Sequence, residues 1–275
     1  MKLYDFDGDF QRHLSDWMVK SRGKYKTMDD MELAAPDEYM VWMNKPADFL
    51  DGEKPGMFFR KFDDAAMLVE WMNEYEAKGN GAPDLLLERI TDLGEDAVDP
   101  LVKLIENEGA RAAARISAVN LLKEIDDPSP AGALLRFVVE RKKKDDLADC
   151  CAEFLQDRGA GVLDDMIAAY PEASAAAKDT LLDILTNFPG DPRVFDFALD
   201  AFLKESDRLA VNASYLEKLG DPRAVEPLKE VIRRPEINYL DYLEIKNAIE
   251  ALGGETDFTR EFAGDPYYES LRNME

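Results

Sequence analysis

The sequence predicts an all-α protein of stacked helix pairs, preceded by a mostly helical N-terminal region. Two observations predict this class: apolar residues recur at helical spacing, and a unit of about 31 residues repeats along the second part of the chain. A third observation separates the two regions. Residues 1–83 hold 13 of the 27 aromatic residues and nine of the 11 methionines. We expect three segments: residues 1–83, residues 84–255 with about five helix pairs, and a tail over residues 256–275.

The N-terminal region contains two segments with the pattern of an amphipathic helix. The first follows the i, i+3, i+4, i+7 spacing with Phe10, His13, Leu14 and Trp17. The second covers residues 66–72 and is opened by Asp63-Asp64, whose negative charge favours a helix N-terminus. Residues 79–83, Gly-Asn-Gly-Ala-Pro, break the chain before the repeats. We expect this region to cap one end of the stack.

The repeats have consistent starts and stops. Candidate units run over residues 95–125, 127–157, 159–188, 190–219 and 221–252, with starts separated by 32, 32, 31 and 31 residues. Asp-Pro stands just before the first apolar stretch of three units, at Asp127, Asp191 and Asp221, where Asp suits an N-cap and Pro a turn or the first helical position. Glycine follows the second apolar stretch, as at Gly220. One helix pair cannot bury its apolar faces alone, so neighbouring pairs must stack.

Residues 219–228, Leu-Gly-Asp-Pro-Arg-Ala-Val-Glu-Pro-Leu, resemble the inter-repeat signature of HEAT repeats, particularly the short repeats of phycobilisome lyases. The resemblance implies a right-handed α–α superhelix whose second helices line a concave, partner-binding side. Candidate solvent-facing residues on the second helices are Asn120, Lys123, Asp149, Glu153, Asp183, Asn187, Asn212, Tyr215, Lys246 and Asn247. Their acidic pairs favour a basic or polar protein surface. The alternative is a solvated face with no binding role.

Charge and composition exclude several function classes. The formal net charge is −24, which repels phosphate backbones and anionic membranes, so no nucleic-acid or membrane partner is expected. The lone His13 fits a packed position, and the adjacent Cys150 and Cys151 lack metal-ligand spacing. We therefore predict no catalytic residue, metal site or cofactor. With two cysteines, no export signal and no long apolar run, we expect a cytoplasmic location.

The leading functional hypothesis is a non-enzymatic scaffold or adaptor that binds a protein or peptide on the concave face. An alternative is an enzyme or chaperone-like factor, similar to lyase-associated HEAT proteins, that acts on a protein-bound cofactor. A reactive Cys150, or carboxylates that converge between residues 1–83 and the repeats, would favour that alternative. In a third hypothesis the aromatic N-terminal region recognises the partner and the repeats support it.

Overall fold

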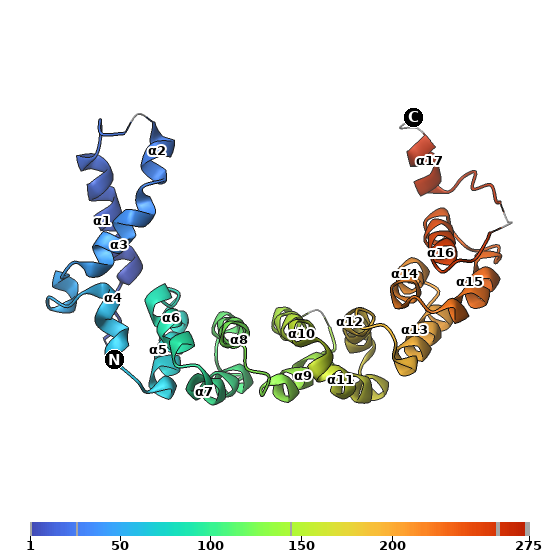
Figure 1. The fold of residues 1–275 in the computed structure, drawn as a ribbon, viewed down its shortest axis with the longest axis horizontal. Helices are drawn as coiled ribbons and strands as arrows, with labels where there is room; N and C mark the ends of the chain where they lie inside the picture. Colours follow the sequence, from blue (N-terminus) through green and yellow to red (C-terminus); the bar gives the residue numbers. More distant parts are fainter. Residues whose placement is uncertain (1, 26, 144, 257–258, 273–275) are drawn as a thin grey trace. The chain divides into compact units, whose positions relative to one another are not determined.

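The computed structural model describes residues 2–25, 27–143, 145–256 and 259–272. These residues form helices and contain no strand, which confirms the predicted all-α class (Figure 1). The chain divides into two compact units, residues 1–130 and residues 131–275. Within the described ranges, none of the helices is both long and apolar enough to cross a membrane.

Unit 1 joins the aromatic-rich region to the first repeats. The helices predicted around Phe10 and around residues 66–72 are confirmed as α1 and α5. Helix α5 packs against the helices on the far side of Pro83. The helices of unit 1 are α1 (Phe6–Lys20), α2 (Met28–Glu32), α3 (Ala35–Asn44), η1 (Asp48–Leu50), α4 (Pro55–Phe58), η2 (Phe59–Lys61), α5 (Ala65–Lys78), α6 (Asp84–Asp92), α7 (Glu95–Glu106) and α8 (Ala112–Ile125).

Aromatic packing holds the N-terminal part of unit 1 together. The buried ring of Phe6 lies 5.4 Å from Phe49, 5.6 Å from Phe58 and 5.1 Å from Phe59, measured between ring centroids. The first turn of α5 is capped as predicted, because the Asp64 side chain accepts a hydrogen bond from the Met67 amide at 3.0 Å. Aromatic rings each bury a large apolar area, so this cluster joins the short segments between α3 and α5 into one core.

Unit 2 consists of helix pairs. Each of the repeat units predicted over residues 127–252 holds two helices, and Figure 1 shows the second helices α10, α12, α14 and α16 along one row and the first helices along another. The helices of unit 2 are α9 (Ala131–Glu140), α10 (Asp146–Arg158), η3 (Gly159–Val162), α11 (Leu163–Ala169), η4 (Tyr170–Glu172), α12 (Ala175–Leu185), α13 (Pro192–Lys204), α14 (Leu209–Leu219), η5 (Pro222–Ala224), α15 (Val225–Ile232), α16 (Tyr239–Ala251) and α17 (Pro266–Arg272).

Two loops of unit 2 repeat the same local structure. The carboxylate of Asp191 accepts a hydrogen bond from the Arg193 amide at 2.8 Å, and Asp221 accepts one from the Arg223 amide at 2.9 Å. Both aspartates are therefore N-caps, as predicted. Gly220 ends α14 with a φ of +67°, a left-handed conformation that glycine adopts without strain.

The C-terminal tail packs on the last helix pair. Phe262 is buried, with its ring centroid 5.1 Å from that of Tyr239 and 4.9 Å from that of Tyr242. The Asp265 carboxylate accepts a hydrogen bond from the Tyr239 amide at 3.0 Å, at the start of α16. These contacts are the ones expected of a segment that covers the end of a helix stack. Phe258, part of the expected tail, lies outside the described residues.

Two glycine-to-alanine substitutions in unit 2 should change stability in opposite directions. Gly220→Ala places a Cβ in the left-handed region and should lower the free energy of unfolding by about 1 kcal/mol. Gly132 lies in the first turn of α9 with open space where a methyl group would point, so Gly132→Ala should raise it by about 0.5 kcal/mol. Urea unfolding of both variants measures the difference, and changes of the same sign would contradict this account of the two positions.

Candidate functional site

Most of the predicted partner-binding residues reach the surface. In unit 2, Glu153, Asp183, Asn187 and Asn247 are exposed, whereas Asp149 and Lys246 are half-buried. Asn187 lies two residues beyond the end of α12, and the others lie on α10, α12 or α16. In unit 1, Asn120 is exposed and Lys123 is half-buried, both on α8. We use the name second-helix face for the exposed side of α10, α12, α14 and α16 in unit 2.

Asn212 and Tyr215 do not lie on that face. Only 1% of Asn212 and 5% of Tyr215 is exposed, so the prediction that they face solvent is wrong. The Asn212 Nδ2 donates to Glu205 Oε2 at 3.4 Å, and the Tyr215 hydroxyl donates to the Asp183 carboxylate. Their polar groups therefore have hydrogen-bond partners within the protein, although Asp183 itself is exposed, which makes burial of these polar side chains acceptable. The neighbouring Val211 and Lys218 are exposed residues of α14.

Ion pairs connect α12 to α14. The Arg208 guanidinium at the N-terminus of α14 pairs with the Asp179 carboxylate on α12. One helical turn further along α12, the Lys218 Nζ lies 3.7 Å from Asp183 Oδ1. Both side chains of the second pair are about half exposed, so water screens their attraction. The Arg208–Asp179 pair is less exposed, at 30% and 42%, and is therefore screened less, while Asp183 remains accessible to a partner.

Arg141 connects three helices at the other end of the face. Its side chain, at the end of α9, is 7% exposed, and its Nη1 donates to Asp149 Oδ1 at 2.7 Å and to Thr180 Oγ1 at 2.9 Å. The bonds reach α10 and α12, respectively. A buried guanidinium needs such an anionic partner, because an unpaired buried charge is costly. Asp149 is thus part of the internal structure, whereas Glu153 and Asp183 are exposed acids of the same two helices.

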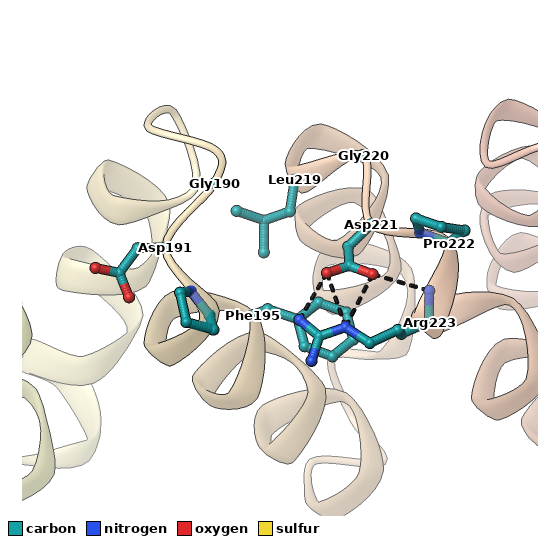
Figure 2. Close-up of a pocket in the computed structure, with 9 residues that line it drawn as sticks. Gly190, Asp191, Phe195, Leu219, Gly220, Asp221, Pro222 and Arg223 are labelled. Carbon is teal, nitrogen blue, oxygen red and sulfur yellow. Dashed lines mark hydrogen bonds and ion pairs between the residues drawn. The ribbon is translucent and has the colours of Figure 1, made fainter.

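The pocket in Figure 2 belongs to the two repeated loops. It has a volume of about 320 Å³ between the starts of α13 and η5. The Arg223 guanidinium lies 4.1 Å from the ring centroid of Phe195. Its Nε donates to both Asp221 carboxylate oxygens, at 3.1 Å and 2.9 Å, and its Nη2 donates to Oδ2 at 2.7 Å. These bonds from Arg223 lower the pKa of the Asp221 carboxyl. Arg223 therefore neutralises the Asp221 carboxylate, whereas Asp191, the other acid of the lining, forms its ion pair with Arg193.

The residues considered for catalysis are held in separate places. The His13 Nε2 lies 3.3 Å from Glu38 Oε2, and both side chains are about one-fifth exposed. Cys151 is buried and Cys150 half-buried, and neither is part of a disulfide. Among the described residues there is no group of three or more His, Cys, Asp or Glu side chains that could hold a metal ion. Carboxylates from residues 1–83 and from the repeats do meet, since Asp7 and Asp84 line one pocket of unit 1.

Comparisons with known proteins add no direct support for the resemblance to HEAT repeats. No known protein family matches the chain, and no curated protein is similar to it in sequence. The HEAT-like interpretation therefore depends on residues 219–228 and on the regular helix pairs of the structure.

Two buried tyrosines of unit 2, Tyr170 and Tyr215, should make the fold sensitive to alkali. Burial, followed by the charges of Glu205 and Asp200, raises the pKa of Tyr170 to about 12. Burial and the Asp183 carboxylate raise the pKa of Tyr215 to about 12. The unfolded chain loses these protons near pH 10 and the folded chain near pH 12. The contribution of these tyrosines to the free energy of unfolding is therefore fully present below pH 10. Between pH 10 and 12 it is lost, by roughly 2 kcal/mol for each tyrosine.

Tyr215→Phe should reduce this pH-dependent loss, because phenylalanine cannot ionise. The measurement is the unfolding free energy at intervals between about pH 9 and 12, in urea, for the wild type and the variant. Tyr267→Phe, at a tyrosine that is 45% exposed, is the control and should leave the pH dependence unchanged. Identical pH dependence for Tyr215→Phe and the wild type would contradict the role given to burial.

Proposed function

We propose that this protein is a non-enzymatic binding protein that holds a basic segment of a protein or peptide on the second-helix face of unit 2. The observation that carries the proposal is the placement of Glu153 and Asp183. Both carboxylates are exposed, and they project from α10 and α12, which pack against one another. Two acids on adjacent helices match an extended chain with several positive side chains, because each helix can contact a different residue of that chain.

Electrostatics favours a positive partner. The chain carries a net charge of −24, and the field of such a protein accelerates encounter with basic segments. The side chain of Lys218, which pairs with Asp183, is itself 45% exposed and forms only a long ion pair. A basic partner can replace that contact at little cost, since exposed ion pairs contribute less than about 1 kcal/mol. The half-buried ion pair of Arg141 with Asp149 would remain in place.

The rigid support under the face also suits binding. Arg141 connects α9, α10 and α12, and Arg208 connects α12 to α14, so the exposed acids stand on helices that are already fixed to their neighbours. Binding to such a surface costs less conformational entropy than binding to a loop that must first become ordered. A preformed face of this kind suits a scaffold or adaptor rather than a site formed by induced closure.

We further propose that the helix pairs form a HEAT-like superhelix. Two features support this assignment: the helix pairs recur every 31 or 32 residues, and the Asp-Pro-Arg loops at Asp191 and Asp221 have the same capping bonds. Repeat folds host many unrelated functions, so the functional proposal depends on the acidic face and not on the fold class.

A pair of charge reversals tests the binding face. Glu153→Lys combined with Asp183→Lys should weaken binding of a fluorescein-labelled ten-residue oligolysine peptide by about tenfold at low salt, because two attractive contacts become repulsive. The matched control combines Asp165→Lys on α11 with Glu230→Lys on α15. Both control residues are exposed and lie on first helices. The two variants carry the same net charge, so fluorescence anisotropy separates the face from the overall charge. Equal weakening by both variants would overturn the proposal.

A further inference from the structure

Unit 1 contains a pocket of about 180 Å³ that the proposed function does not use. It lies where α1 and α3 meet the start of α6, so its walls come from both sides of Pro83. The buried Phe6 and Leu85 are part of its lining. Pockets for drug-sized ligands and cofactors start near about 300 Å³, so this one suits a single functional group instead.

Three aromatic rings line the pocket without stacking face to face. The ring centroids lie 5.0 Å apart for Phe10 and Tyr39, 5.3 Å for Phe10 and Trp42, and 5.6 Å for Tyr39 and Trp42. The corresponding interplanar angles are 85°, 53° and 32°. The indole Nε1 of Trp42 donates to Asp9 Oδ2 at 3.0 Å, which holds that ring and satisfies its polar group. Trp42 is 4% exposed, whereas Phe10 and Tyr39 are half-buried, so the accessible part of this wall comes from Phe10 and Tyr39. Aromatic ring faces carry negative electrostatic potential and attract cations.

Two carboxylates complete the pocket. Asp7 and Asp84 are exposed at its edge, in the first turns of α1 and α6, where the helix dipoles stabilise negative charge. Among the described residues neither carboxylate has an ion pair. Burial and the charge of Asp84 raise the pKa of Asp7, and burial, Glu88 and Asp84 raise the pKa of Tyr39. The negative charges therefore repel one another across the pocket, and a bound cation would relieve that repulsion.

We propose that this pocket binds an alkylated ammonium group, held against Phe10, Tyr39 and Trp42 and neutralised by Asp7 and Asp84. Ca²⁺ and Mg²⁺ need about six or more oxygen ligands, which an aromatic wall does not supply. A zinc site needs a group of His, Cys, Asp or Glu ligands, and no group of three or more is found among the described residues. An anion would be repelled, and an apolar group would leave the two carboxylates uncompensated. An alkylated ammonium has positive charge, an apolar surface and few or no N–H donors to satisfy, and aromatic rings are well suited to that combination.

The test compares choline with 3,3-dimethylbutanol, which has the same shape but no charge. The probe is the indole N–H signal of Trp42 in nuclear magnetic resonance spectra of the full chain. Choline should move this signal with a dissociation constant of about 1 mM or tighter, while the signals of Trp17 and Trp71 should stay in place. The neutral alcohol should bind at least about tenfold more weakly, because it lacks the cation–π and ionic contributions. Equal affinity for both compounds, or no saturable binding of choline, would overturn the proposal.

Two substitutions separate the charge from the aromatic wall. Asp84→Asn keeps the shape of an exposed side chain and should weaken choline binding by about fivefold through the lost ionic attraction. Tyr39→Leu removes a ring face and should weaken it by a similar factor of about five. Asp99→Asn, at an exposed aspartate on α7, is the matched control and should have no effect. Circular dichroism checks the fold, and unchanged binding by folded Asp84→Asn would count against the site.

A second titration identifies whether the alkylated ammonium group belongs to a protein side chain or to a free small molecule. A short peptide with one trimethyllysine, compared with the same peptide carrying unmodified lysine, reports whether the pocket accepts the cation from a protein chain. Tighter binding of the modified peptide supports a side-chain ligand, and binding of choline alone supports a free small cation. Both outcomes retain the alkylated ammonium. This site lies in unit 1 and shares no residue with the second-helix face, so either proposal can fail without the other.

Discussion

The structure depends on burial of apolar helix faces between neighbouring helix pairs. No pair of about 30 residues can remove its own leucines and valines from water, so each must pack against the next. Leu134 of α9, Phe202 of α13 and Ile245 of α16 are fully buried, each on a different pair. At the ends of the series of helix pairs, aromatic residues cover the apolar faces instead. Phe262 of the tail does so against α16, and the ring cluster around Phe6 fills the N-terminal part of unit 1.

Packing between neighbours also decides which polar groups remain accessible for function. A charged or hydroxyl group at a helix–helix contact must find a partner inside the protein, as Arg141 does with Asp149 and Tyr215 does with Asp183. Glu153, on the outer side of a second helix, is among the groups that stay in contact with water. A candidate binding residue on a repeat helix is therefore identified by its exposure in the packed structure and not by its polarity alone.

The two proposed sites differ in the kind of ligand they suit. The second-helix face is open and presents exposed acids on rigid helices, which matches an extended segment with several positive charges. The pocket of unit 1 is small and aromatic, which matches one cationic group with an apolar surface. This pocket also concerns the enzyme hypothesis. That hypothesis requires carboxylates that converge from residues 1–83 and from the repeats, and Asp7 and Asp84 line the same pocket from the two sides of Pro83. Because an aromatic wall can hold an alkylated cation, we propose that this pocket binds one.

The sequence by itself determined the helix pairs over residues 95–252 and the two helices around Phe10 and residues 66–72. Helical spacing around Phe10, the caps at Asp64, Asp191 and Asp221 and the left-handed Gly220 are local effects, and each is visible in a few consecutive residues. Only the tertiary structure decided which side of a helix faces water. Asn212 and Tyr215 are polar, and sequence polarity placed them outside, but both are buried and donate hydrogen bonds to the neighbouring Glu205 and Asp183 carboxylates. The pocket in unit 1 had no sequence signal, because Phe10, Tyr39 and Asp84 are far apart in the chain and meet only when α1, α3 and α6 pack together.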